Sequence, residues 1–339
     1  MKIAIRADGG NKIGMGHIMR TLVLAKELAK TNYVFYICRD DNPLSDKYKS
    51  GIEKINGEGF NIITIDESNI LDKLKDISAD CLITDSYDVE EEYFNKTKKL
   101  FKLTGYIDDM NLYNFNVDFI INQNIGAEEF KYKVDKDTKL FLGTKYTMLR
   151  EEFRNTPIRS INKDVSDIML TLGGSDVNGI TNTILDYIKD LQFNFHVVVG
   201  PSFEEHNIEN LKKIEGLKSN IKLYFNPNMI EIMNKCDITI SACGSTLYEL
   251  SSLGVPTIGV IIADNQANIA KKMEKENLIL NLGFYNSLKK EDFINSINFL
   301  MSNYLFRVNM SKNQQKIINK NGVSKLAYEI NNKFKNRIK

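Results

Sequence analysis

The sequence predicts an α/β protein of two domains, each built on a parallel sheet, that face each other across a cleft. Three observations predict this class. Short apolar runs rich in β-branched residues alternate with helical patterns in the first half, a polar stretch without sustained apolar periodicity covers residues 150–164, and the alternation then restarts. We expect domains at 1–152 and 153–310, and a helical segment at 311–339 that packs back on them.

The individual elements follow from local patterns. Strands are expected, in chain order, at KIAIRA, VFYICR, NIITI, CLITD, LTGYID and DFIINQ, and in the second half at DIMLTLGG, FHVVVGP, IKLYF, DITISA and TIGVII. The helix after the first strand places one apolar face at Ile18, Leu22, Ala25 and Leu28. A second apolar stripe, which predicts a terminal helix docked on a domain, consists of Val323, Leu326, Ala327 and Ile330.

Composition limits the class of partner. The 339 residues are 42% hydrophobic and 26% charged with a net charge of +1, so no global field favours nucleic acid or an anionic membrane. No window reaches the roughly 18 apolar residues that a membrane span needs, which predicts a cytoplasmic protein without membrane insertion. A small molecule is the expected partner. The four cysteines lack metal-site spacing and are expected to be buried, reduced thiols.

Three turns rich in Gly and Ser follow predicted strands, at residues 8–17, 170–179 and 240–250. Ligands of open parallel sheets bind at the carboxyl ends of strands, where helix N-termini present backbone amides. The first turn begins like a dinucleotide-binding GxGxxG, but Met19 stands where the third glycine should be, and the chain has no GxxxxGK[ST] loop. The sequence therefore predicts a site of another kind.

His17 is the candidate catalytic residue of the first turn. A cation at a helix start opposes the helix dipole, so the neutral imidazole is favoured there, and it can accept a proton from water as a general base. Gly14 and Gly16 let a ligand approach the backbone closely. The alternative is a histidine that only bonds the backbone near the helix N-terminus.

In the second turn, Gly173 and Gly174 expose backbone N–H groups that could bind an anion. Ser175 and Asp176 follow them, and helix capping alone is an equally good explanation of that pair.

The third turn brings Ser245 and Thr246 to a helix start, where their amides and hydroxyls could bind a diphosphate. Glu249 lies about one turn further on, and its carboxylate could accept both hydroxyls of a ribose. The alternative for Glu249 is an exposed helical glutamate.

Polar side chains also end two other strands. Asp85 and Tyr87 follow CLIT, while Asn265 and Gln266 follow TIGVIIA, where their amides could bind sugar hydroxyl or acetamido groups. Ordinary turn chemistry explains either group equally well. The single Asp-x-Asp, residues 135–137, lies in a lysine-rich stretch typical of a solvated loop, so we expect neither a metal site nor a cofactor.

Taken together, these stretches resemble the UDP-sugar hydrolases of pseudaminic acid biosynthesis, UDP-2,4-diacetamido-2,4,6-trideoxy-β-L-altropyranose hydrolase. Related proteins of other surface and spore-coat polysaccharide pathways share the motifs. The matching stretches, spread over most of the chain, are RADGG (6–10), IGMGHIMR (13–20), DSY (85–87), IDD (107–109), YTMLREEF (146–153), LGGSD (172–176), SACGSTLYE (241–249) and DNQ (264–266).

The resemblance implies a glycosyltransferase-B-like fold with two Rossmann-like domains, in which the second half holds most of the UDP. It implies that His17 is the general base, that Tyr87 and Asn265 contact the sugar, and that Glu249 holds the ribose. The first two matched motifs also place four residues among those expected to bind substrate, namely Asp8, Gly14, Gly16 and Arg20.

The implied reaction is metal-independent attack of water on the anomeric carbon, with inversion and release of UDP. The spacing from His17 to Arg20 favours the hydrolases over the peptidoglycan N-acetylglucosaminyl transferase that shares the broad fold. Two alternatives stay open: a transferase that uses the same sugar nucleotide with another acceptor, and a non-catalytic nucleotide-sugar-binding subunit.

Overall fold

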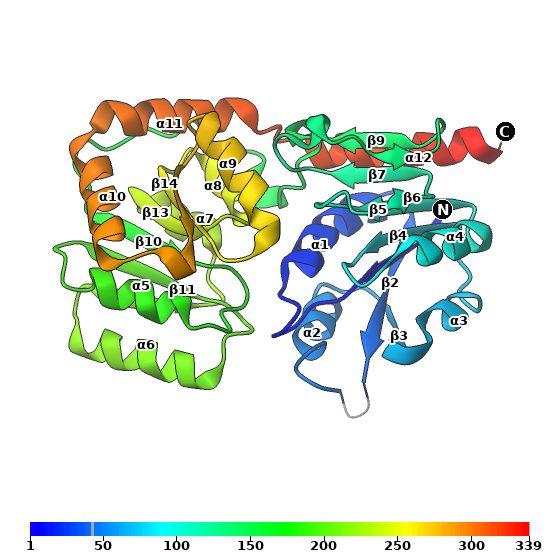
Figure 1. Ribbon diagram of the computed structural model, residues 1–339, viewed down its shortest axis with the longest axis horizontal. Helices are drawn as coiled ribbons and strands as arrows, with labels where there is room; N and C mark the ends of the chain where they lie inside the picture. The colour runs from blue at the N-terminus through cyan, green and yellow to red at the C-terminus, as the bar shows by residue number, and fades with distance from the viewer. Residues whose placement is uncertain (42–43, 339) are drawn as a thin grey trace. The chain divides into compact units, whose positions relative to one another are not determined.

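Two separate parallel sheets organise the computed structural model, which describes residues 1–41 and 44–338 (Figure 1). The contacts of the chain divide it into a first unit, Met1–Leu149 with Asn321–Lys339, and a second unit, Arg150–Lys320. The chain passes from the first unit to the second between residues 149 and 150, three residues before the boundary expected at 152/153. It returns to the first unit between residues 320 and 321, which divides the expected C-terminal segment 311–339.

The first unit carries a seven-stranded sheet of order β3-β2-β1-β4-β5-β7-β9, parallel throughout. Its strands are β1 (Lys2–Ala7), β2 (Tyr33–Asp40), β3 (Ile62–Asp66), β4 (Cys81–Asp85), β5 (Leu103–Ile107), β7 (Phe119–Asn122) and β9 (Lys139–Leu142). A separate parallel pair is formed by β6 (Asn114–Phe115) and β8 (Lys133–Val134). The helices are α1 (Gly16–Ala29), α2 (Lys49–Gly57), α3 (Ile70–Leu74), α4 (Glu91–Leu100) and α12 (Gly322–Ile338).

The second unit repeats the arrangement with a six-stranded parallel sheet of order β12-β11-β10-β13-β14-β15. Its strands are β10 (Asp167–Thr171), β11 (Asn194–Val199), β12 (Ile221–Phe225), β13 (Ile238–Ala242), β14 (Thr257–Ile261) and β15 (Leu280–Phe284). Its helices are α5 (Ile180–Ile188), α6 (Glu205–Leu217), α7 (Met229–Lys235), α8 (Thr246–Leu253), α9 (Ala267–Lys275), α10 (Lys290–Ser302) and α11 (Tyr304–Ile317).

Both sheets reverse their strand order beside the first strand. The chain runs outward from β1 to β3 and returns to β4 on the other side of β1, and β10 to β13 repeat this course. In the first unit α1 packs in one apolar cluster and α4 in another, on opposite faces of the sheet. The loops after β1 and β4 therefore diverge, which leaves the crevice at the carboxyl ends where ligands of such sheets bind.

All eleven predicted strand runs form strands of the two sheets, but the sequence reading missed β9 and β15. Both are edge strands. β9 has four residues and follows a charged loop, while β15 contains Asn281 and Gly283, the latter at φ +85°, so neither shows a sustained apolar pattern.

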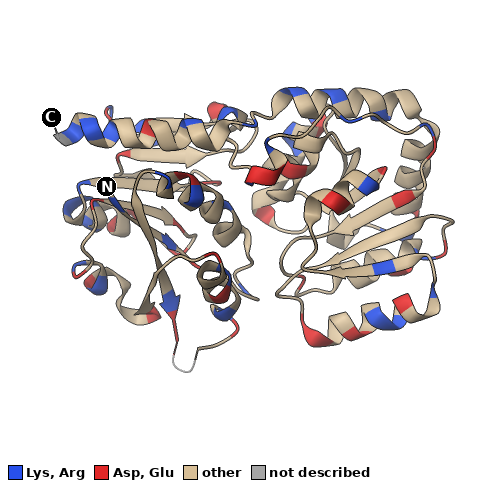
Figure 2. Ribbon diagram, turned by 180° about the vertical axis from the view of Figure 1, so that it is seen from behind, with Lys and Arg blue, Asp and Glu red and all other residues tan. Residues whose placement is uncertain are grey.

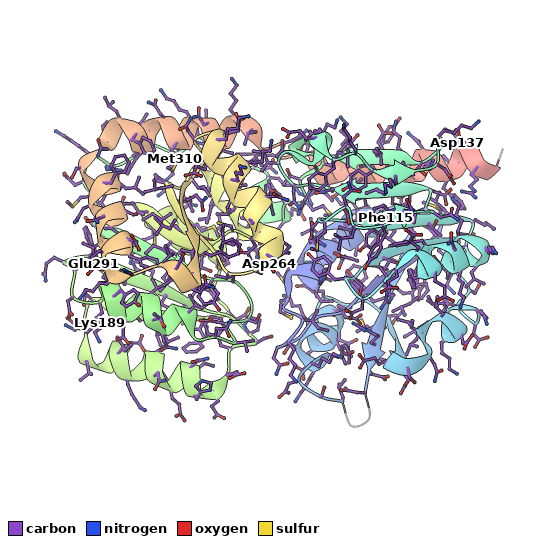
Figure 3. The ribbon with its side chains drawn as sticks, in the orientation of Figure 1. Phe115, Asp137, Lys189, Asp264, Glu291 and Met310 are labelled. Atoms are coloured by element: carbon purple, nitrogen blue, oxygen red, sulfur yellow. The ribbon has the colours of Figure 1, made fainter. Side chains whose placement is uncertain are left out.

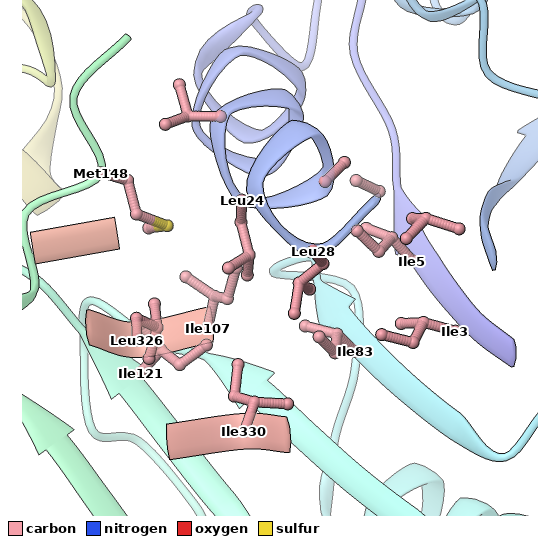
Figure 4. Close-up of a cluster of buried hydrophobic side chains, with 14 of the residues drawn as sticks. Ile3, Ile5, Leu24, Leu28, Ile83, Ile107, Ile121, Met148, Leu326 and Ile330 are labelled. Atoms are coloured by element: carbon pink, nitrogen blue, oxygen red, sulfur yellow. The ribbon is translucent and has the colours of Figure 1, made fainter. Parts of the chain in front are cut away.

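The expected alternation also fails in the first unit, because no α-helix lies between β5 and β7 or between β7 and β9, and the only helical element of the latter connection is a 3₁₀ turn, Ala127–Glu129. The C-terminal helix α12 covers this part of the sheet instead. Leu326 and Ile330, from the predicted apolar stripe, share a buried cluster with Ile121 of β7 (Figure 4). Phe141 of β9 belongs to the same cluster. The last segment of the chain thus completes the core of the first unit.

The placement of the cysteines agrees with the expectation from the sequence. All four cysteines are free and buried. Figure 2 shows Lys and Arg alternating with Asp and Glu along most helices of both units. Within residues 1–41 and 44–338, no helix combines the length and the apolarity that crossing a bilayer requires.

Candidate functional site

The loop between β1 and α1 holds His17 in the first turn of the helix, as predicted. Gly14 adopts φ +82° and exchanges two backbone hydrogen bonds with Gly10, at N···O distances of 2.8 and 3.3 Å. A Cβ on Gly9 would lie 2.5 Å from Ile18, so the loop folds tightly against its own helix. By contrast, a Cβ on Gly16 would meet nothing within 4 Å.

Asp85 at the end of β4 is the hydrogen-bond partner of His17. Strands β1 and β4 are paired with Ala7 opposite Asp85, which brings the Asp85 carboxylate beside the start of α1. The His17 Nδ1 atom lies 2.6 Å from Asp85 Oδ1, and both side chains are buried. His17 therefore meets a charged side chain, unlike the alternative in which it only bonds the backbone.

The protonation of this pair follows from the charge around it. Burial alone would raise the pKa of the Asp85 carboxyl, but Arg20 and His17 outweigh burial and lower that pKa to about 2. Ionised Asp85 can only accept, so Nδ1 of His17 must donate. In the neutral imidazole, Nε2 is then the atom with the lone pair.

Arg20, one turn along α1, is enclosed between two carboxylates. Its Nε and one terminal nitrogen donate to the two oxygens of Asp85, each at 2.6 Å. Its other terminal nitrogen donates to both oxygens of Asp109, at 2.7 and 2.9 Å. The side chain is only 10% exposed. These contacts hold Arg20 toward Asp85 and Asp109, although the sequence reading expected it among the substrate-binding residues.

Two further donors converge on Asp109, which follows β5. The Tyr87 hydroxyl donates to Oδ2 at 2.6 Å, and the Asn124 side-chain amide donates to Oδ1 at 2.8 Å. The Tyr87 ring also meets the His17 ring edge-on, with centroids 4.6 Å apart. Burial raises the pKa of the Tyr87 hydroxyl, with Asp109 adding to the effect. Tyr87 is nevertheless 41% exposed as a residue, so part of its ring faces outward beside His17.

Asp8 lies in the same turn but faces other partners. Its oxygens accept from the backbone N and the Nε of Arg39, at 2.7 and 2.8 Å, and it is 3% exposed. Arg6 lies 3.8 Å from it. The structure thus ties Asp8 to β1 and β2 and does not bring it together with His17.

In the second unit, Gly173 and Gly174 form the turn after β10. Gly173 adopts φ +104°, and a Cβ at that position would meet nothing within 4 Å. Asp176 accepts from the backbone N–H of Ile180 and Thr181, at 2.8 and 2.7 Å, at the start of α5. The capping explanation therefore holds for Asp176, while the two glycines remain candidates for anion binding.

The turn after β13 places Ser245 and Thr246 at the start of α8, with Glu249 in the first turn of that helix. Arg150 donates two hydrogen bonds to the Glu249 carboxylate, from Nε to Oε1 at 2.7 Å and from a terminal nitrogen to Oε2 at 3.0 Å. Its guanidinium also lies over the ring of Phe153. Glu249 is 17% exposed in its side chain and paired, unlike the exposed helical glutamate of the alternative reading.

Asn265 and Gln266 lie in a 3₁₀ turn, Asp264–Gln266, between β14 and α9. Figure 3 labels Asp264, the first residue of this turn. Gln266 Oε1 accepts from the backbone N–H of Ile262 at 3.0 Å. Its Nε2 lies 3.7 Å from the position of a Cβ on Gly244. Gln266 therefore joins the turn after β14 to the glycine turn after β13, at the carboxyl edge of the second sheet.

The Asp-x-Asp segment lies elsewhere in the first unit. Asp135 and Asp137 line a groove of about 1080 Å³ that also includes Lys98, Lys333 and Arg337. This groove lies at the amino ends of β7 and β9, whereas His17 lies at the carboxyl ends of β1 and β4. Among residues 1–41 and 44–338, no three His, Cys, Asp or Glu side chains group in a way that could hold a metal ion.

Sequence reasoning missed the partners of the candidate residues. Asp109 and Arg150 lay inside matched motifs without an assigned role, and Asn124 was not singled out. A weak signal exists for Asp109 and Asn124, because each follows a strand that ends at the same edge of the sheet as Asp85. Nothing in the sequence pairs Arg150 with Glu249, which lies 99 positions away.

Relatives in sequence extend over most of the chain. An uncharacterised protein of Methanocaldococcus jannaschii is 34% identical over 317 residues, covering 87% of this chain, and the chain spans about 62% of that protein's length. The spore coat polysaccharide biosynthesis protein SpsG of Bacillus subtilis is 25% identical, with 96% of this chain and 97% of that protein covered. The UDP-2,4-diacetamido-2,4,6-trideoxy-β-L-altropyranose hydrolase of Campylobacter jejuni is 23% identical, with 81% and 97% covered.

The second unit and the whole fold have separate matches. Residues 168–330 match the glycosyltransferase family 28 C-terminal domain. The crystal structure of Acinetobacter baumannii MurG superimposes with a TM-score of 0.65 at 13% identity, covering 98% of this chain and 99% of that one. The chain therefore has the glycosyltransferase-B fold, with two parallel Rossmann-like sheets, as the sequence predicted.

Proposed function

We propose that the protein is a hydrolase that releases UDP from a UDP-linked diacetamido-trideoxy sugar, of the kind made in pseudaminic acid or related nonulosonate biosynthesis. The observation that carries the proposal is the His17–Asp85 contact of 2.6 Å, because it leaves Nε2 as the proton acceptor next to Gly16, where a Cβ would meet nothing within 4 Å. The name of the Campylobacter jejuni relative supports the substrate class.

In the proposed reaction His17 acts as general base. Nε2 takes a proton from water as the water oxygen bonds to the anomeric carbon, and the bond from that carbon to the diphosphate oxygen breaks with its electron pair leaving on UDP. Attack from the face opposite the leaving group inverts the carbon. Such a base typically contributes a factor on the order of 10²–10⁴ in rate.

We assign nucleotide binding to the second unit. Gly173 and Gly174 supply backbone N–H groups, Ser245 and Thr246 supply the start of α8 for the diphosphate, and Glu249 accepts from the ribose hydroxyls. Donors of this kind can stabilise the charge of a leaving UDP, so the proposed reaction needs no metal ion. We propose that Tyr87, Asn265 and Gln266 bind the sugar, because hydroxyl and amide groups suit its hydroxyl and acetamido substituents.

The match of residues 168–330 to a glycosyltransferase domain favours a second candidate, a glycosyltransferase that uses the same donor with an acceptor other than water. The two candidates differ in what the protein does with a UDP-sugar alone. A hydrolase releases UDP with multiple turnovers, whereas a strict transferase, like a non-catalytic binding subunit, leaves the donor almost intact.

The decisive experiment is hydrolysis in ¹⁸O-labelled water with a panel of UDP-linked amino sugars. We expect the label in the released sugar and unlabelled UDP, because attack occurs at carbon. His17→Asn should keep UDP binding and lower turnover by a factor on the order of 10² or more. The exposed His206 on α6 offers a matched control, and His206→Asn should retain full turnover.

Two outcomes would contradict the proposal. Label in UDP would mean attack at phosphorus, and full turnover of His17→Asn would exclude that residue as the base.

A further inference from the structure

The contacts around His17 form one continuous chain of charges. Asp85 binds His17 through one oxygen, Arg20 binds both oxygens of Asp85, and the same guanidinium binds both oxygens of Asp109. All three side chains beyond His17 are at most 10% exposed. Nothing in general-base chemistry alone requires the second carboxylate.

The protonation of each member follows from its partners. Asp109 accepts four hydrogen bonds, two from Arg20 and one each from Tyr87 and Asn124, so it is present as the acceptor-only carboxylate. Asp85 is ionised because Arg20 and His17 overcome its burial, which lowers the pKa of its carboxyl to about 2. Two carboxylates against one guanidinium leave a single negative charge when the imidazole is neutral.

Titratable groups from several elements lie around His17 and Asp85. Arg20 comes from its own helix, Asp85 from β4 and Tyr87 from the loop after β4, while Tyr36 on β2 interacts electrostatically with Asp85. Both tyrosines are neutral, because burial raises the pKa of each hydroxyl. The carboxyl of Asp108, next to Asp109, has its own partners, Tyr132 and the backbone N–H of Asn111, and burial raises its pKa. The uncompensated charge is therefore shared by Asp85 and Asp109.

We infer that Asp85, Arg20 and Asp109 are positioning residues whose combined charge is completed by the proton that His17 takes up. Arg20 keeps Asp85 ionised, so Asp85 holds the Nδ1–H tautomer and cannot itself take the proton. Asp109 balances Arg20, so the imidazolium formed during the reaction makes the buried group neutral. The kinetic part of this inference rests on the proposed function, whereas the tautomer and the charge balance do not.

A test without substrate is possible because the chain has only three histidines. In protein labelled with ¹⁵N-histidine, the His17 signals are those lost in His17→Asn. We expect NMR to show a protonated Nδ1 and an unprotonated Nε2 above neutral pH in the ligand-free wild type. Asp85→Asn should allow the other tautomer, and Asp109→Asn should keep the tautomer but move the titration midpoint of His17 to lower pH by about one unit.

Tyr87→Phe is the matched control, because it removes a hydrogen bond to Asp109 without changing any charge. It should leave the midpoint nearly unmoved. The acid limb of the pH profile of kcat/KM should shift in Asp109→Asn by the same amount as the NMR midpoint.

An unmoved midpoint in folded Asp109→Asn, or an Nε2–H tautomer in the wild type, would overturn the inference whatever the activity. If the NMR results are as expected but no UDP-sugar is hydrolysed, the proposed function fails and the charge balance stands. Asp109→Asn is nearly isosteric, so the inference stays testable even if Asp85→Asn does not fold.

Discussion

At the scale of single residues, both candidate regions pair a carboxylate with an arginine, but in different surroundings. Asp85 is fully buried, and its pair with Arg20 belongs to a closed network. Glu249 and Arg150 keep side-chain exposures of 17% and 26%, so this pair is weaker and can exchange partners with a ligand. The first arrangement fits the proposed role of His17 as a base, and the second fits the proposed binding of a nucleotide at Glu249.

Removing the Glu249 carboxylate tests its proposed ribose contact. Glu249→Gln should weaken UDP binding by about 1–3 kcal/mol, because a carboxylate accepts from two hydroxyls more strongly than an amide does. Isothermal titration calorimetry with UDP measures the change. Glu152 is a suitable control, since its carboxylate also contacts Arg150, at 3.1 Å, so Glu152→Gln should bind UDP like the wild type. If Glu249→Gln binds UDP as tightly as the wild type does, Glu249 is not part of the nucleotide site.

Sequence reasoning identified residues of the candidate sites better than their contacts. His17 and Glu249 stand out because a residue type and a helix start coincide in a short stretch. The partners Asp109 and Arg150 lie 92 and 99 positions away from them, and only the folded chain brings each pair of positions into one network. Local patterns carry no information about such pairs.

At the scale of elements, the parallel strands β5 and β7 are joined without a helix, and a glycine allows their close packing. Gly105 on β5 is paired with Phe119 on β7. A Cβ on Gly105 would lie 2.1 Å from the Phe119 ring. The ring therefore fills the space that a side chain at position 105 would occupy, in the part of the sheet that carries Asp109 and Asn124.

Gly105→Ala should destabilise the protein by about 1–3 kcal/mol, because the buried ring must move to admit the methyl group. Gly57→Ala is the matched control. A Cβ at this position would meet nothing within 4 Å, and alanine has a higher helix propensity than the glycine that ends α2. We expect Gly57→Ala to be neutral or slightly stabilising. Urea denaturation followed by circular dichroism compares the midpoints, and a wild-type midpoint for Gly105→Ala would contradict the packing argument.

The same region explains where element prediction failed. Strong apolar runs predicted every central strand, but β9 and β15 lie at sheet edges, where half-buried positions weaken the pattern. Helix α12, which covers β7 and β9, was expected as a docked terminal segment. It belongs to the first unit because the chain returns to that unit between residues 320 and 321. Sequence periodicity defines a helix and its apolar face without indicating which sheet it covers.

At the scale of the whole molecule, the buried pair of Arg20 and Asp85 links the candidate site to folding. The pKa of the Asp85 carboxyl is lowered to about 2, whereas an unfolded aspartate titrates near the ordinary value of about 3.9. A carboxyl with a depressed pKa in the folded state stabilises the fold above the unfolded pKa. That contribution is lost as pH falls toward the folded pKa. The relevant window is therefore about pH 4 to 2.

Acid unfolding of Asp85→Asn should reveal this contribution. The shift corresponds to about 2 kcal/mol, so the stability advantage of the wild type over Asp85→Asn should shrink by about that amount between pH 5 and pH 2. The free energy of unfolding from urea titrations at a series of pH values measures the difference, in which carboxyls that do not interact with Asp85 cancel. Asp72 of α3 is the control: it is exposed, and chiefly its surface pair with Lys75 lowers the pKa of its carboxyl, so the pH-dependent change for Asp72→Asn should be much smaller than for Asp85→Asn. If the difference between the wild type and Asp85→Asn stays constant over the window, Arg20 does not hold Asp85 ionised, because an ordinary carboxyl would titrate alike in the folded and unfolded chains.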